Sequence, residues 1–328
     1  MKCFRIYSTS TFQEWPQLSL FTALVFAFFF INILNILLII ALMKTNKTST
    51  VTTKLFIYLS FCDLITGLVT LPTQMIVMGL GQSTSCFLIG FQTFFGAFPP
   101  LQSMSTIFTM SLFRFISINK PLKQISNKSL YIILTGHFCI SVIISLWYLR
   151  NILVQQIGHG MGYFLVAATC YIFLVIGSSI TMNVFLHFKL KKERKVSFNI
   201  GFTQSTRRQK NAIMTLIILT SILIICYLPN MIAYSLVGHS ILTNTPNPYR
   251  RLTPITGFLM LTNSGFNSLA YILRTKKIRA YLKELLVVSK VEHHPFIDQN
   301  SVIESGRKNS VYFVSCKLTK VSEVDKYP

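Results

Sequence analysis

The feature that most constrains this chain is a series of seven long apolar runs separated by polar segments. A helix needs about 20 apolar residues to cross a bilayer, so each run is long enough to form a spanning helix. Only 12% of the 328 residues are charged, against roughly 25% in an ordinary soluble domain. This composition excludes a soluble enzyme, a collagen-like rod and a disordered chain. We expect spans at residues 18–43, 55–80, 88–113, 130–150, 162–187, 211–236 and 252–273.

The distribution of lysine and arginine predicts how the runs cross the membrane, because positively charged loops stay on the cytoplasmic side. We therefore expect a multi-pass plasma-membrane protein with an extracellular N-terminus and a cytoplasmic C-terminus. The formal net charge of +22 then reflects this topology and attraction to anionic lipids of the inner leaflet. No nucleic acid is expected as a partner. In this orientation only five of the 31 basic residues lie outside: Lys2, Arg5, Arg150, Arg250 and Arg251.

The chain divides into four parts. Residues 1–17 are expected to form an extracellular N-terminus, and residues 18–273 an all-α bundle of seven transmembrane helices. Residues 274–286 combine a basic face with an apolar face, which is typical of a helix lying along the membrane surface. Residues 287–328 are polar and are expected to form a disordered cytoplasmic tail. The apolar face of the surface helix is made by Ile278, Tyr281, Leu282, Leu285 and Leu286.

Asp63 is the only acidic residue in any of the seven runs. A carboxylate inside a bilayer is costly unless it is solvated, paired or protonated, so it is a functional hypothesis by default. The other interpretation is a structural acid satisfied by neighbouring asparagines. Asn263 and Asn267 lie four residues apart in the last run, hence on one helix face. A carboxylate shared among several helices would supply the partners that buried amides need.

Five short motifs occur in order, each in the expected run, and together they resemble the rhodopsin-like (class A) G-protein-coupled receptors over residues 18–286. Asn35 resembles the asparagine of span one, and Asp63 the acid of the Leu-x-x-x-Asp motif of span two. Residues 113–115, Phe-Arg-Phe, resemble the Asp-Arg-Tyr triplet that ends span three. Residues 226–229 resemble Cys-Trp-x-Pro of span six, and residues 267–271 resemble Asn-Pro-x-x-Tyr of span seven.

The resemblance implies a receptor, not an enzyme, that passes ligand binding outside the cell to a heterotrimeric G protein inside. Arg114 would contact the G protein, and Pro229 would kink span six because it removes a helical hydrogen bond. Tyr227 would lie beneath the ligand cavity. Asn35 and Tyr271 complete the expected activation switch. The tail would serve arrestin and receptor kinases as partners.

The resemblance also implies an allosteric sodium ion, the one cofactor expected. Ser103 lies eleven residues before Arg114, at the family's spacing for the hydroxyl ligand of span three. A carboxylate with hydroxyl and amide oxygens suits a hard cation, which would offset the desolvation of Asp63. The alternative is a protonated Asp63 that donates to Asn35 or Asn267, with no ion. The expected sodium ligands are Asp63, Ser103, Asn263, Ser264 and Asn267.

The chain departs from the family pattern at the positions whose side chains bind Arg114 in the inactive state of the receptor. Phe113 replaces the acid that pairs with Arg114, and Gln209 stands where many members carry a glutamate. Because both charge-assisted partners are missing, we expect raised basal signalling. Ser268 also replaces the proline of span seven.

Cys86 resembles the outer cysteine of span three. The second outer loop, about residues 151–161, has no cysteine to receive it, so Cys86 pairs with Cys3 or forms no disulfide. Cys86 lies three residues further from Arg114 than in the family. We expect Pro99-Pro100 to mark this extra near-turn.

The ligand is poorly specified. Span three has no acid and residues 252–273 have no lysine, which excludes an amine-binding salt bridge and a retinal Schiff base. A neutral, lipid-like or weakly anionic ligand, or a small peptide, fits better than a cation. The rival classes are a seven-helix channel or transporter, and a degenerate receptor that does not signal. Aromatic residues indicate an apolar cavity, although lipid-facing packing explains most of them: Phe91, Phe94, Phe95, Phe98, Tyr227, Tyr234 and Phe258.

Overall fold

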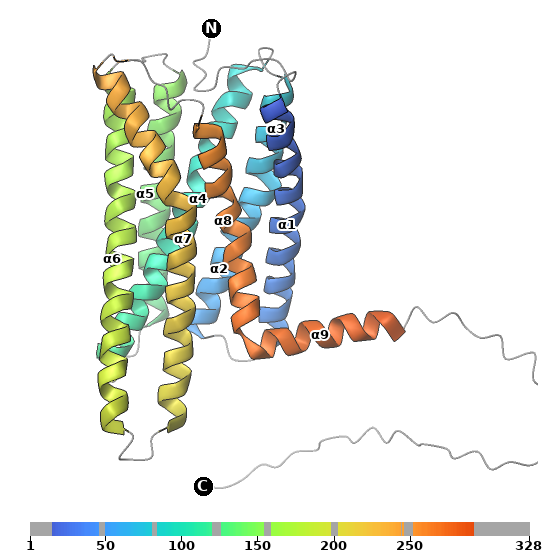
Figure 1. The fold of residues 1–328 in the computed structure, drawn as a ribbon, viewed down its shortest axis with the longest axis vertical. Helices are drawn as coiled ribbons and strands as arrows, with labels where there is room; N and C mark the ends of the chain where they lie inside the picture. The colour runs from blue at the N-terminus through green and yellow to red at the C-terminus, as the bar shows by residue number, and fades with distance from the viewer. Residues whose placement is uncertain are drawn as a thin grey trace, which may run out of the picture. The chain divides into compact units, whose positions relative to one another are not determined.

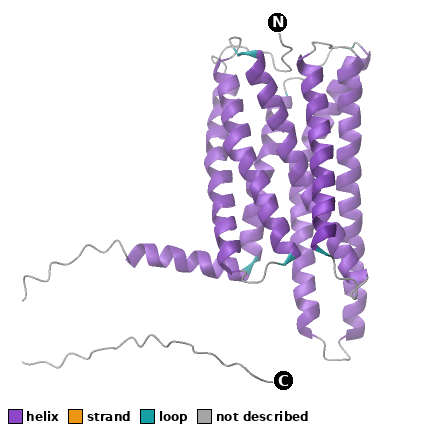
Figure 2. Ribbon diagram, turned by 180° about the vertical axis from the view of Figure 1, so that it is seen from behind, coloured by secondary structure: helices purple, strands orange, loops and turns teal. Residues whose placement is uncertain are grey.

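The described part of the chain is built from helices joined by short connections, and it contains no strand (Figure 2). The structure, a computed structural model, describes residues 15–45, 50–80, 84–119, 126–153, 159–197, 203–243, 245 and 252–291. Cys3, Pro121 and residues 292–328 of the predicted tail lie outside the described residues, as does the side chain of Gln209.

The helices coincide with the apolar runs and extend beyond them into polar sequence. The first three runs correspond to α1 (Trp15–Thr45), to α2 (Val51–Ile65) with the π-helix η1 (Thr66–Thr70) and α3 (Leu71–Leu80), and to α4 (Cys86–Asn119). The next four correspond to α5 (Asn127–Leu153), α6 (His159–Ser197), α7 (Thr203–Thr243) and α8 (Thr253–Arg274). A further helix, α9, covers Lys276–Val291. It begins two residues later than the predicted surface helix and ends beyond it.

Residues up to Glu284 form one compact unit, in which the helices enclose a central α4. α1 lies against α2 and α8, α8 against α7, and α7 against α6, while α5 lies against α4 and α6. α4 contacts α2, α5, α6, α7 and α8 (Figure 1). Because α4 has neighbours on most sides, its side chains are the ones through which the other helices are connected.

Five of the described helices are long and apolar enough to cross a membrane by length and composition: α1, the continuous α2–η1–α3 helix, α5, α6 and α7. α4 and α8 do not meet this measure, although seven spans were predicted. The polar residues of these two helices are largely buried, among them Gln102 and Ser103 of α4 and Asn263 and Asn267 of α8. Their lower hydropathy therefore reflects side chains that face the interior of the bundle.

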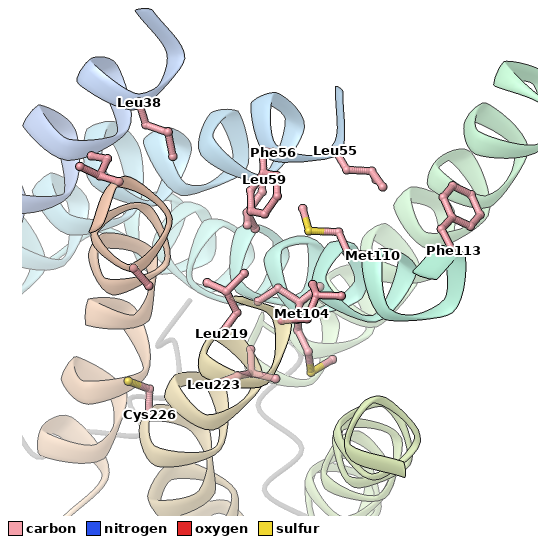
Figure 3. Close-up of a cluster of buried hydrophobic side chains, with 14 of the residues drawn as sticks. Leu38, Leu55, Phe56, Leu59, Met104, Met110, Phe113, Leu219, Leu223 and Cys226 are labelled. Carbon is pink, nitrogen blue, oxygen red and sulfur yellow. The ribbon is translucent and has the colours of Figure 1, made fainter. Parts of the chain in front are cut away.

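The main apolar core joins α1, α2, α4 and α7. Figure 3 shows Leu38, Phe56, Met104 and Leu219 within this cluster, one from each of these helices. Ile278 of α9 is also buried in it. The apolar face predicted for residues 274–286 is thus partly used to attach the first turns of α9 to the bundle.

Close contacts between helices depend on glycines at several places, among them Gly67 of η1, which faces Asn32 of α1. A Cβ added to Gly265 of α8 would lie 2.5 Å from Cδ1 of Phe30 on α1. Gly162 of α6 and Gly238 of α7 face each other, and an added Cβ on either would lie 3.1–3.2 Å from the other's carbonyl oxygen. Small residues allow such approach in helix pairs, so α6 and α7 are joined almost backbone to backbone here.

The prolines of α4 leave its helix continuous, contrary to our expectation of an extra near-turn at Pro99-Pro100. The π-helical turn that the structure describes lies instead at Thr66–Thr70 of the neighbouring helix. Because neither residue 99 nor residue 100 has an N–H, the carbonyl of Phe95 loses its usual donor. Thr70 Oγ1 donates to that carbonyl at 2.7 Å. A side chain of η1 therefore replaces the hydrogen bond that the prolines remove, as is common in membrane helices.

We predict that Thr70→Val lowers the free energy of unfolding by about 0.6–2 kcal/mol, the range measured for hydrogen bonds between membrane helices. Thermal unfolding of the purified protein measures this loss. In a Pro99→Ala background the cost should shrink, because residue 99 then supplies an N–H to the carbonyl of Phe95. Thr181→Val is the matched control, since the Thr181 hydroxyl bonds only its own helix at Gly177. Equal losses in both backgrounds would contradict this account.

Candidate functional site

The centre of the bundle holds a buried polar cluster around Asp63, whose side chain is 0% exposed. Asn267 of α8 donates through Nδ2 to Oδ2 of Asp63 at 3.3 Å and to Oγ of Ser103 on α4 at 3.2 Å. The Ser264 side chain also lies close enough to interact with the Asp63 carboxyl. One amide thus connects α2, α4 and α8, and the predicted residues Asp63, Ser103, Ser264 and Asn267 come together.

Asn35 connects α1 to the same cluster. Its Nδ2 donates to the carbonyl of Ile31 at 2.8 Å and to the carbonyl of Ser264 at 3.2 Å. Its Oδ1 accepts a 2.5 Å hydrogen bond from Ser268 Oγ. Ser268, which departs from the family pattern, therefore makes a specific bond between α8 and α1.

Two oxygens of the cluster have no hydrogen-bond partner although they are buried, Oδ1 of Asp63 and Oδ1 of Asn267. The predicted ligand Asn263, one turn earlier on α8, is also buried with Oδ1 and Nδ2 unpartnered, so within the described part of the chain no hydrogen bond joins it to the cluster. Buried polar atoms normally have partners, so orphaned ones indicate an ion or water. A carboxylate and amide oxygens are hard ligands, which suit a hard cation. The described residues contain no group of three or more His, Cys, Asp or Glu side chains that could hold a metal ion. The cluster therefore offers one carboxylate together with neutral hydroxyl and amide oxygens.

Arg114 lies near the end of α4 and is held by α2. Its Nη2 donates to Thr52 Oγ1 at 3.1 Å. Four residues further along α2, the ring of Phe56 packs on Tyr271 with the ring centroids 3.6 Å apart. Arg114 and Tyr271 also lie within electrostatic reach of each other. Two predicted switch residues, from α4 and α8, therefore meet on one face of α2.

Sequence reasoning missed Thr52 and Phe56. A helical projection of residues 51–65 places them on the same face, but nothing in the sequence identifies which partner they meet. Phe113, predicted to replace an acid, is 5% exposed and belongs to the main apolar core. It therefore points away from the polar partners of Arg114.

Tyr227 of α7 lies between the polar cluster and a cavity. Its hydroxyl donates to the carbonyl of Pro100 on α4 at 2.9 Å, and it lies within electrostatic reach of Asp63. Pro229 lies inside α7 two residues later. Tyr227 is also one of the residues that line the cavity, so it lies between the cavity and the carboxyl of Asp63.

The cavity has a volume of about 150 Å³, is partly open and is lined by α3, α4, α5, α6, α7 and α8. None of the described residues that line it is charged. Its polar side chains include Gln74 of α3, Gln92 of α4 and Asn230 of α7, none of which sequence reasoning identified. A largely apolar cavity with a few polar groups is typical of a small-molecule site.

Most of the aromatic residues predicted for this cavity do not line it. Only Tyr227 and Tyr234 do. The lining residues of α4 recur at helical spacing, for example Gln92, Gly96 and Pro100. Phe91, Phe94, Phe95 and Phe98 lie on the other side of α4, where they stack on one another. The polar and small residues of α4 recur every four residues, and this spacing could have identified the face of α4 that lines the cavity.

A second buried polar contact connects three helices one turn from Arg114. Asn183 of α6, 3% exposed, donates through Nδ2 to Ser111 Oγ on α4 at 3.2 Å and to Thr220 Oγ1 on α7 at 2.9 Å. The only sequence signal was a lone asparagine in an apolar run. Asn183 ties α6 and α7 to α4 on the side where Arg114 lies.

Cys86 is disulfide-bonded. Its predicted partner, Cys3, lies outside the described residues, so the pairing stays a prediction. The four other cysteines that the structure describes are free.

A comparison with protein families gives one match. The family described as 7 transmembrane receptor (rhodopsin family) matches residues 34–271, which is most of the chain and includes every residue of the polar cluster. No curated protein matches the chain.

We predict that Ser268→Ala lowers the free energy of unfolding by about 0.6–2 kcal/mol, because Asn35 Oδ1 loses its donor. Thermal unfolding of the purified protein measures the change. Ser221→Ala is the control, since the Ser221 hydroxyl is exposed and bonds only its own helix at Ile217. If both variants unfold at the wild-type temperature, the bond between Ser268 and Asn35 does not stabilise the bundle.

Proposed function

This chain belongs to the rhodopsin family of seven-transmembrane receptors, and from that membership we propose that it couples an extracellular ligand to guanine-nucleotide exchange on a heterotrimeric G protein. It is a receptor and a multi-pass membrane protein. The ligand would occupy the cavity, and the G protein would bind at the end of the bundle where Arg114 lies. The observation that carries this proposal is Tyr227, which lines the cavity and lies within electrostatic reach of Asp63.

We propose that all seven helices cross the plasma membrane, with the N-terminus outside and α9 at the inner surface. The buried polar residues of α4 and α8 support this, because they face other helices and leave apolar side chains toward lipid. The distribution of lysine and arginine supports the orientation. Arrestin and receptor kinases are the proposed partners of residues 287–328.

Signalling would proceed by a population shift between two arrangements of the bundle. In the arrangement that the structure describes, α2 holds Arg114 through Thr52 and holds Tyr271 through Phe56. The bond from Arg114 to Thr52 joins a cation to a neutral hydroxyl. It takes the place of the carboxylate partners that the arginine has in the family. A carboxylate partner would add the attraction between opposite charges to the hydrogen bond, and the Thr52 hydroxyl does not. Raised basal exchange therefore remains our proposal for this receptor.

We predict that membranes containing the full chain support ligand-free nucleotide exchange on at least one member of a panel of G-protein chimeras. Arg114→Gln should abolish this exchange. Thr52→Val should raise it about tenfold or more, since it removes a hydrogen bond to a charged group, of about 1.5–3 kcal/mol, that holds the resting arrangement. Thr22→Val is the control, because the Thr22 hydroxyl bonds only its own helix at Leu18.

Surface expression of each variant must be equal for these comparisons. Exchange on no chimera, or exchange that Arg114→Gln leaves intact, would contradict the proposed function. A cation current in patch-clamp recordings without exchange would favour a channel instead.

We also propose that Asp63, Ser103, Asn263, Ser264 and Asn267 hold a sodium ion. The unpartnered oxygens of Asp63, Asn263 and Asn267 support this assignment. Bound sodium would neutralise the buried carboxylate and so favour the arrangement in which the cluster is open. The competing state is a protonated Asp63 with no ion, in which the acid itself donates a hydrogen bond.

We predict that sodium suppresses ligand-free nucleotide exchange relative to a large organic cation at equal ionic strength. A difference in affinity of about 1.4 kcal/mol between the two arrangements would change exchange about tenfold. Asp63→Asn and Ser103→Ala should abolish the sodium effect. Ser221→Ala should retain it, because the exposed Ser221 hydroxyl bonds only its own helix at Ile217. The same sodium response in wild type, Asp63→Asn and Ser103→Ala would rule out the site.

A further inference from the structure

Two glycines in the cavity wall leave space that no side chain fills. A Cβ added to Gly96 of α4 or to Gly257 of α8 would meet no atom within 4 Å, and both residues line the cavity. At Gly162, by contrast, an added Cβ would lie 2.6 Å from Leu242. Glycine inside a helix costs about 0.5–1 kcal/mol relative to alanine. Since Gly96 and Gly257 permit no close helix contact in return, their structural effect is to widen the cavity.

Two amides in the cavity wall are available to a ligand. Within the described part of the chain, the half-buried side chains of Gln74 and Gln92 have no hydrogen-bond partner. The other polar groups there are already engaged: Tyr227 bonds the carbonyl of Pro100, and Asn230 contacts Met260 and Thr256. A carboxamide both donates and accepts hydrogen bonds. Gln74 and Gln92 can therefore bind a hydroxyl or a carbonyl group.

The size and charge of the cavity limit what it can hold. Its volume is about 150 Å³, and an apolar cavity of about that volume engineered into another protein binds benzene. A charged group placed there would lose its hydration without meeting an opposite charge, which is strongly unfavourable. The cavity therefore fits one ring of carbon atoms and a neutral head group.

We propose that the ligand is a small uncharged molecule, about the size of a single six-membered ring, with one hydroxyl or carbonyl head. Its ring occupies the space beside Gly96 and Gly257, and its head bonds the amide of Gln92 or Gln74. The two glycines set the size of the ligand, and the two glutamines select its head group. This inference rests on the proposed function in one respect, that the molecule bound in the cavity is the ligand of the receptor.

Three probes separate size, charge and head group. Benzyl alcohol carries the ring and a neutral hydroxyl, benzylamine has the same number of heavy atoms but is a cation at neutral pH, and toluene lacks the head. Binding to the folded state raises the unfolding temperature of a purified protein. We expect a saturable rise with benzyl alcohol, a weaker one with toluene and none with benzylamine.

Variants of the wall test where the probe binds. Gly96→Val and Gly257→Val should weaken benzyl alcohol binding at least tenfold, and Gly96→Ala should weaken it less. Gly136→Val is the matched control, because Gly136 also has open space around it but lies on α5 outside the cavity. It should bind as the wild type does. Gln92→Leu, with Gln74→Leu, should reduce benzyl alcohol binding to the level of toluene and leave toluene binding unchanged.

Three results would overturn the inference: no saturable rise with benzyl alcohol, an equal rise with benzylamine, or unchanged binding in Gly96→Ala, Gly96→Val and Gly257→Val. The assay contains no G protein, so its failure is distinct from failure of the proposed function. A protein that binds benzyl alcohol as expected but promotes exchange on no G protein keeps the cavity assignment and loses the receptor mechanism. A protein that promotes exchange but binds none of the neutral probes loses this inference alone.

Discussion

A carboxylate buried in an apolar bundle must find its partners inside the protein, and the arrangement around Asp63 follows from that constraint. The side chain of Asp63 is 0% exposed, and each unsatisfied polar group in lipid costs several kcal/mol. The amide of Asn267 supplies one bond and at the same time fixes Ser103, so that α2, α4 and α8 are held in one register. Oδ1 of Asp63 and Oδ1 of Asn267 are left without a partner. The need of Asp63 for hydrogen-bond partners thus joins the helices and also forms a buried polar site.

The departures from the family pattern look like losses in the sequence but are compensated in the structure. Ser268, in place of a proline, donates to Asn35. Pro99 and Pro100 remove two donors from α4, and Thr70 of the adjacent helix bonds the carbonyl of Phe95. Phe113 cannot pair with Arg114, but it packs in the core while Thr52 holds the guanidinium. Each substitution is balanced by a contact from a different helix, which no motif in the sequence records.

Features that depend on neighbouring residues could be predicted from the sequence, and contacts between residues far apart in the chain could not. Apolar runs and basic loops are local patterns, so the positions of the helices were found correctly, although α4 and α8 are more polar than a spanning helix usually is. Asp63 stood out because a charge in an apolar run is rare. The cavity was misplaced, because aromatic content shows that a helix face is apolar but not whether it meets lipid or a void. Thr52 and Asn183 act through partners about 40–70 residues away, and pairing at that separation leaves no periodic trace.

The contact between Gly162 and Gly238 has a mechanical consequence for α7. It joins α6 and α7 almost backbone to backbone near one end of α7, while the helix continues to Thr203 at the other end. Pro229 lies between these points and removes one hydrogen bond of the helix. α7 is therefore held against α6 at one end and is easier to bend at Pro229. The part of α7 from Pro229 to Thr203 is about 39 Å long at 1.5 Å per residue. A bend of about 10° at Pro229 would move Thr203 by about 7 Å. On this geometry, any rotation of α7 about Pro229 would produce its largest displacement at Thr203, far from the contact between Gly162 and Gly238.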